Sequence, residues 1–196
     1  MPASHAAIVD IDTGSRDLQQ CADSVIRLRA EYLFSRGRFD AVSFKFTSGD
    51  PARYADWRAG LRPEISGSRV EWKKKTAPNP SYHSFRAYLD VVFTYAGTLS
   101  LERELRSVPR VSDLRAGDIF IQGGSPGHAV IVADVAENPS TSARAFVLVQ
   151  GFMPAQDIHI VRNQSTGTPW YPASFGETLS TPHWAFAAKS LRRFGD

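Results

Sequence analysis

A change of hydrophobic period at about the middle of the chain constrains its fold more than any other feature. After residue 117 the sequence contains four runs of strand length that are rich in valine, isoleucine and phenylalanine: DIFIQ, HAVIVADV, AFVLVQ and DIHIV. Turn residues separate these runs, and short connections favour antiparallel neighbours. The run WAFAAKSL near the C-terminus predicts a last strand. The second half of the chain is therefore expected to form an antiparallel sheet.

The first half has helical periodicity instead. Apolar residues recur at spacings of three and four along the strongest helix pattern, at Leu18, Cys21, Val25, Leu28 and Tyr32. Asp17 followed three residues later by Gln20 resembles a capping box and predicts that the helix starts near them.

A second helix is expected within residues 81–97, and a third, shorter one directly after it. Short strands are expected at 6–11 and 41–46, a short helix at 50–57, and mostly loop at 62–80. Helices first and strands later indicate an α+β fold with helices on one face of a sheet. The length of 196 residues suits a single domain, 1–196, with a helical insert at about 50–108.

Composition excludes several functional classes. The formal charge is +3, with basic and acidic residues mixed along the chain, so no nucleic-acid surface is expected. No apolar stretch approaches the roughly 18 residues that span a bilayer, so no membrane span is expected. The N-terminus lacks the pattern of a secretory signal, and the compartment and oligomeric state stay open. No phosphate loop, dinucleotide fingerprint or nucleophilic serine motif is found, so no cofactor is expected.

A glycine-rich loop, QGGSPGH, places His128 at the start of an apolar run. Such a histidine is typical of a catalytic site if a nucleophile lies nearby, and the single cysteine, Cys21, lies near a helix start. Amides at a helix N-terminus favour a thiolate, and an imidazole takes the thiol proton. We therefore expect Cys21 and His128 to meet, and the pKa of Cys21 to be lowered.

A third polar group orients the imidazole in many such sites. Gln150 ends the strand after that of His128 and is the predicted orienting residue. Gln19, Gln20 or a backbone amide beside Cys21 is predicted to hydrogen-bond a developing oxyanion.

Several segments resemble a known family. LQQCADSVIRLRAEYL, YAGTLSLERE, GGSPGHAVIV and QGFMPAQDIHI look like an uncharacterised bacterial family, domain of unknown function 4846. More distantly, a cysteine that opens a helix, then the Gly-Asp and Gly-His strands of AGDIFIQGGSPGHAVIV, resembles papain-like NlpC-type endopeptidases and CHAP amidases. The distant resemblance implies a papain-like α+β fold and a thiol hydrolase with Cys21, His128 and Gln150 as catalytic residues. Its implied partner is a peptide, glycopeptide or other amide substrate, such as a cell-wall peptide.

Two other functions remain open. The context Gln20-Cys21-Ala22-Asp23 departs from the Asp-Cys-Ser-Gly pattern of NlpC-type enzymes, which favours a catalytically silent domain that binds a peptide or glycan. The shared thiol chemistry also fits an acyltransferase or thioesterase. At the residue level, Cys21 is alternatively a small core residue, and Asp23 lies on a polar helix face. Asp157 and His159 share a strand face but lack a further ligand of comparable quality for a metal site.

Overall fold

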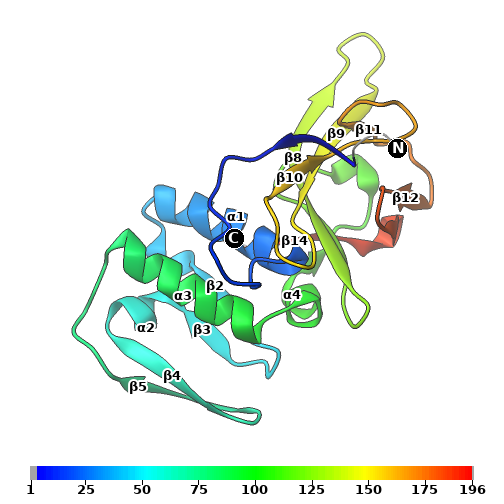
Figure 1. The fold of residues 1–196 in the computed structure, drawn as a ribbon. Coiled ribbons are helices and arrows are strands. Elements are labelled where there is room, and N and C mark those ends of the chain that lie inside the picture. The colour runs from blue at the N-terminus through cyan, green and yellow to red at the C-terminus, as the bar shows by residue number, and fades with distance from the viewer. Residues whose placement is uncertain (1–3, 196) are drawn as a thin grey trace.

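The largest element of the fold is an antiparallel sheet of eight strands, built mostly from the second half of the chain (Figure 1). The structure is a computed structural model and describes residues 4–195. The strands are β1 (His5–Ile8), β6 (Arg106–Ser107), β7 (Ile119–Gln122), β8 (His128–Glu137), β9 (Arg144–Gln150), β10 (His159–Val161), β11 (Trp170–Pro172) and β14 (Leu191–Arg193). Seven follow the order β1-β10-β9-β8-β7-β14-β6, and β11 also pairs with β9. The α+β fold with antiparallel strands is thus confirmed.

Both faces of this sheet are buried, because alternate side chains of β7 and β8 enter two different apolar clusters. Ile119 and Ile131 join the cluster that contains the helices. Phe120 and Val130 join the cluster on the opposite face. This second face is covered by the hairpin of β12 (Thr178–Ser180) and β13 (Ala185–Ala187). The helices therefore cover one face, as expected, and a small hairpin covers the other.

The helices within residues 4–195 are α1 (Cys21–Ser35), α2 (Tyr54–Arg58), α3 (Tyr82–Tyr95) and α4 (Thr98–Glu104), with short 3-10 turns η1 (Phe39–Ala41), η2 (Val111–Asp113) and η3 (Ala188–Ser190). Helix α1 packs on the central strands β8 and β9, and α3 lies on its outer side (Figure 1). Because it is covered from both sides, α1 buries Val25, Ile26 and Leu33, while Tyr32 stays 50% exposed. The predicted apolar stripe was wrong at Tyr32.

The start of α1 is fixed by a capping contact different from the predicted one. The carboxylate of Asp23 accepts the backbone N–H of Gln20 at 3.0 Å, so Gln20 is the N-cap and Cys21 the first helical residue. Asp17 instead accepts the side-chain amide of Gln20 at 3.2 Å and the backbone N–H of Ala155 at 2.6 Å. The predicted pair Asp17–Gln20 therefore exists, but it ties the preceding turn to the loop after β9.

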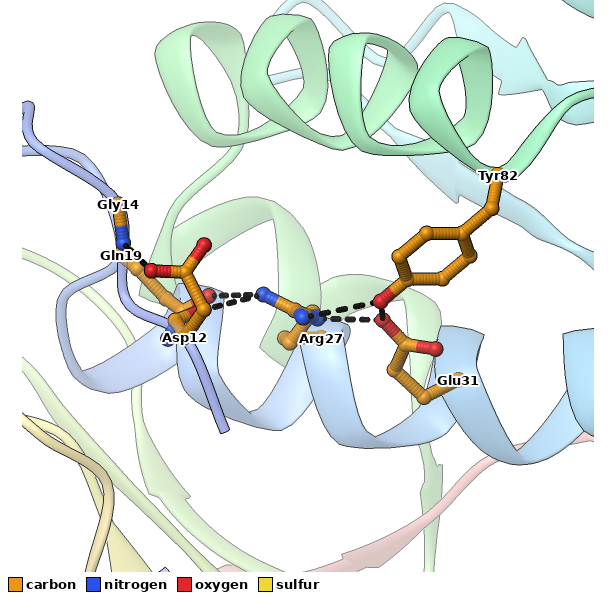
Figure 2. A network of polar contacts seen from close by, with 6 residues as sticks. All are labelled: Asp12, Gly14, Gln19, Arg27, Glu31 and Tyr82. Carbon is orange, nitrogen blue, oxygen red and sulfur yellow. Dashed lines mark hydrogen bonds and ion pairs between the residues drawn. The ribbon is translucent and has the colours of Figure 1, made fainter. Parts of the chain in front are cut away.

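A fully buried arginine fastens α1 to its surroundings (Figure 2). Arg27 is 2% exposed, and its Nη1 donates to the backbone carbonyl of Asp12 at 2.9 Å and to Oε1 of Gln19 at 2.8 Å. Its Nε donates to Glu31 at 2.7 Å, and its Nη2 donates to the Tyr82 hydroxyl of α3 at 3.3 Å. All three guanidinium nitrogens are bonded, as a buried charge requires. These bonds fix the position of the helix that presents Cys21.

Residues 50–108 contain more strand than predicted. The helix expected at 50–57 begins only at Tyr54, because β3 (Pro51–Arg53) pairs with the predicted strand β2 (Ser43–Lys45). β4 (Leu61–Ser66) pairs with β5 (Arg69–Lys74) across the segment expected to be loop. Figure 1 shows the β4–β5 hairpin on the side of the helices away from the main sheet. Lys73 forms ion pairs with Glu64 across the hairpin and with Glu71 along its own strand. Paired charges concealed the strand pattern, because charged residues at these positions resemble a solvated loop.

Candidate functional site

A cavity of about 360 Å³ opens at the N-terminus of α1, where the helix meets the end of the main sheet. Cys21 and His128 both line it. The other walls come from the glycine loop before β8, the segment after β9, and aromatic residues Phe93, Phe152 and Trp184. The two residues predicted to meet are thus placed at one cavity, although 107 residues separate them in the sequence (128 − 21).

Cys21 is surrounded by both favourable and unfavourable groups for a thiolate. The backbone amides of Ala22 and Ala129 lie at the thiol and favour the charged form. Burial opposes them and raises the pKa of Cys21 above its ordinary value, with a smaller contribution from the nearby carboxyl of Asp23. The expectation of a lowered pKa was wrong, because desolvation outweighs the helix amides. The resting side chain is a thiol.

His128 is the first residue of β8 and is held by Gln150, the last residue of β9. The ring atom Nε2 lies 2.8 Å from Oε1 of Gln150. Because a carboxamide oxygen only accepts, Nε2 is the donor, and in the neutral ring Nδ1 carries the lone pair. Burial lowers the pKa of His128, against the opposing effect of the Gln150 hydrogen bond. At neutral pH the cavity is therefore lined by a neutral imidazole and a neutral thiol.

Aromatic rings enclose the imidazole of His128. Its ring centroid lies 5.4 Å from that of Phe152, 5.5 Å from Trp184 and 5.9 Å from Phe186. His128 has the same strand phase as Val130, which packs under the β12–β13 hairpin, whereas α1 lies on the opposite face. The imidazole and the thiol therefore approach the cavity from the two faces of the sheet, at the point where β8 begins.

Gln150 is 1% exposed and bonded at both ends of its carboxamide. Its Nε2 lies 3.1 Å from Nε2 of His159, which faces it directly across the β9–β10 pair. His159 in turn places Nδ1 3.0 Å from the backbone carbonyl of Asp157. The side chain of Asp157 accepts from Thr13 at 3.4 Å at the surface. His159 thus belongs to a hydrogen-bonded row behind His128. No group of three or more potential metal-binding side chains occurs within residues 4–195.

The two glutamines predicted to lie at the oxyanion have different positions. Gln20 lines the cavity, and its side-chain amide donates to Asp17. Gln19 is 0% exposed, accepts from Arg27, and is absent from the cavity lining (Figure 2). The structure therefore places Gln20 at the cavity and Gln19 in the network that supports α1.

Comparison with known families covers nearly the whole chain. The model of the family described as domain of unknown function (4846) matches residues 2–193. The chain belongs to that family. No curated protein and no solved structure matches it. None of the helices that the structure describes has the length and apolarity that a membrane crossing needs.

In this member of the 4846 family, Asp23 is a site residue that the sequence did not reveal. It was expected on a polar helix face, yet it is 7% exposed and lines the cavity two residues after Cys21. Its Oδ2 caps the helix, while Oδ1 is buried without a hydrogen-bond partner among the described residues. Burial raises the pKa of Asp23 to about 7. An acid at the third helical position is usual for capping, so its burial had no separate sequence signal.

Two glycines in this family member let separate segments approach the site closely. A Cβ on Gly127 would lie 2.5 Å from Oγ1 of Thr98 and 2.6 Å from the carbonyl of Gly124. A Cβ on Gly151 would lie 2.1 Å from Oγ of Ser24 and 3.0 Å from the carbonyl of Gln20. Gly127 therefore allows the loop to turn tightly before His128, and Gly151 lets the end of β9 contact the start of α1.

Proposed function

We propose that this protein is a thiol hydrolase that cleaves an amide or peptide bond, with Cys21 as nucleophile, His128 as base and Gln150 as orienting residue. The observation that supports this proposal most is the 2.8 Å hydrogen bond from Nε2 of His128 to Gln150. It leaves the lone pair of Nδ1 free to accept a proton, on a ring that lines the same cavity as the only cysteine.

The reaction starts from the neutral pair. Sγ of Cys21 attacks the carbonyl carbon while the thiol proton moves to Nδ1 of His128, which avoids a free thiolate in a buried site. The C–N bond then breaks, and the leaving amine takes the proton from Nδ1. Water attacks the resulting thioester with His128 again as base, and releases a carboxylic acid and the thiol. A backbone amide beside Cys21, or the side chain of Gln20, donates to the oxyanion.

The cavity composition favours neutral or cationic substrates near the thiol. Among residues 4–195 no lysine or arginine lines it, whereas Asp17 and Asp23 do. Phe93, Phe152 and Trp184 supply apolar walls. A peptide or amide, including a cell-wall peptide, fits this lining better than a substrate with a phosphate near the scissile bond.

Binding without turnover is the second candidate, and a specific observation favours it. Asp23 opposes the thiolate of Cys21, and burial raises the pKa of the thiol. A cavity of this kind holds a peptide or glycan without cleaving it if His128 does not take the proton. An acyltransferase or thioesterase would use the same groups with another acceptor or another acyl bond.

The test combines trapping and product analysis. The purified protein is incubated with a peptide library and a cell-wall digest, and products and protein adducts are identified by mass spectrometry. A new carboxylic acid and amine from one substrate, formed by the wild type and absent with Cys21→Ser, would support the hydrolase. Bound but intact ligand would support the binding protein. A covalent acyl adduct that is transferred to an added amine would indicate an acyltransferase.

A further inference from the structure

Three side chains from adjacent strands form a continuous row of hydrogen bonds that ends on a backbone carbonyl. The row runs from His128 on β8 to Gln150 on β9 and His159 on β10, with separations of 2.8 Å and 3.1 Å. It ends 3.0 Å from the carbonyl of Asp157. His128 is 3% exposed, Gln150 1% and His159 7%, so water does not compete for these bonds.

The backbone carbonyl at the end of the row determines which atom donates and which accepts in each hydrogen bond. Because the Asp157 carbonyl only accepts, Nδ1 of His159 must donate. A neutral imidazole has one N–H, so Nε2 of His159 accepts, and the group facing it must be the NH₂ of Gln150. The carboxamide then presents Oε1 to His128, whose Nε2 donates and whose Nδ1 keeps its lone pair.

We propose that His159 is a positioning residue that sets the tautomer of His128 through the amide of Gln150. This inference rests on the proposed function only in naming Nδ1 of His128 as the atom that accepts the thiol proton. Gln150 alone cannot select the tautomer, because its amide has two nearly isosteric ends. The acceptor atom of His159 distinguishes these ends.

Protonation of His159 reverses the row. Both ring nitrogens then donate, so Nε2–H of His159 faces the NH₂ of Gln150, donor against donor. Rotation of the carboxamide by half a turn relieves this contact and presents NH₂ to His128. Nε2 of His128 must then accept, its proton moves through solvent to Nδ1, and the ring loses its ability to take the thiol proton.

The surroundings of His159 keep it neutral above mildly acidic pH. Burial lowers its pKa, and His5 and His183 oppose a positive charge there. The His5 ring, from β1, lies 6.1 Å from the His159 ring between centroids. The hydrogen bond to the Asp157 carbonyl acts in the opposite direction. At neutral pH the row therefore holds His128 in the tautomer whose Nδ1 accepts a proton. In acid the row reverses, and Nδ1 of His128 already carries a proton.

The test is the tautomer of His128, measured from the ¹⁵N shifts of its two ring nitrogens in protein labelled at histidine. At pH 7.5 the wild type is expected to show the Nε2–H tautomer. His159→Phe removes the acceptor and is expected to lower the ratio of Nε2–H to Nδ1–H by about tenfold, the effect of one hydrogen bond. His159→Gln can place a carboxamide oxygen near the former Nε2 and is expected to restore the ratio. His5→Gln is the matched control, since His5 contacts the His159 ring but lies outside the row.

A second background separates positioning from a general loss of structure. In Gln150→Glu the carboxylate accepts from His128 whatever stands at position 159, so adding His159→Phe should no longer change the ratio. The wild type should also lose the Nε2–H tautomer in the pH range in which His159 titrates, and His159→Gln should lack this step. An unchanged ratio in His159→Phe, or a step that persists in His159→Gln, overturns the proposal.

These readings need neither substrate nor turnover. A tautomer that follows residue 159 in a protein that forms no product would refute the proposed hydrolase and leave the row intact. If product forms but the tautomer ratio of His128 does not change with residue 159, the hydrolase is supported and the role proposed for His159 is refuted.

Discussion

At the scale of single residues, the site is defined by two neutral groups rather than by an ion pair. Burial raises the pKa of Cys21 and lowers that of His128, so each group resists the charge that an ion pair would require. In the proposed hydrolase, reactivity then depends on transfer of the thiol proton during attack, and on the base that accepts the proton.

His128→Ala tests this dependence. We expect alkylation of Cys21 by iodoacetamide at pH 7 to slow by at least about tenfold, because the acceptor of the thiol proton is lost. The rate is followed against pH by mass spectrometry of the intact protein. His83→Ala, which alters an exposed histidine of α3, should leave the rate unchanged. Equal rates in wild type and His128→Ala would mean that Cys21 is an unassisted core thiol.

Elements meet at the site through close contacts that leave no space for extra atoms. Gly151→Ala is expected to push the start of α1 away from the end of β9, since its Cβ would lie 2.1 Å from Oγ of Ser24. We expect a loss of about 1–3 kcal/mol in the free energy of unfolding and slower labelling of Cys21. Ser24→Ala should partly rescue Gly151→Ala, because the nearest atom is removed. Denaturant titration measures the free energy of unfolding of the single and the double variant. A double variant no more stable than Gly151→Ala would refute this contact as the cause of the lost stability.

Arg27 joins α1 to the segment that precedes it and, through Tyr82, to α3. Replacing it by methionine keeps much of the apolar stem but leaves Gln19 and the Asp12 carbonyl unpaired, so we expect a cost of about 2–4 kcal/mol. Arg16→Met is the control, because the Arg16–Asp90 pair is exposed and should contribute about 0–1 kcal/mol. Urea unfolding at pH 7 compares them. Similar losses of unfolding free energy in both variants would show that the buried network contributes no more to stability than the exposed pair.

For the whole molecule, stability should depend on pH through Asp23. Its pKa is about 7 in the folded protein, against about 3.9 in an unfolded chain. The folded state thus retains a proton that the unfolded state has released, so this contribution is fully present below about pH 4 and is lost as the pH rises through about 7. The loss is up to about 4 kcal/mol, since each pKa unit corresponds to about 1.4 kcal/mol.

Asp23→Asn keeps an oxygen for the Gln20 amide and removes the titration. Relative to wild type, the variant should therefore gain stability between pH 5 and pH 8, as measured by urea unfolding at both values. Labelling of Cys21 at pH 8 should also become faster, because the carboxylate that opposes the thiolate is gone. A difference between wild type and variant that is the same at pH 5 and pH 8 would contradict the assignment of the titration to Asp23.

Local periodicity and turn chemistry were enough to predict several elements and site residues. Alternation and β-branched residues predicted β7, β8 and β9, and helical spacing predicted α1 and α3. The glycine loop and the strand end indicated His128 and Gln150, because a polar residue at the limit of an apolar run reaches the rim of a sheet. These signals lie within a few residues of one another, so no partner is needed to interpret them.

The contacts of those residues depend on how distant segments of the chain pack together. His159 lies beside Gln150 because β10 pairs with β9, a register that no local pattern specifies. Asp23 is buried at the start of α1, which raises its pKa, and the burial of Cys21 itself reversed the expected direction of the Cys21 pKa shift. Burial, cross-strand register and the charges of distant residues arise when remote segments pack, and for that reason they were absent from the sequence pattern.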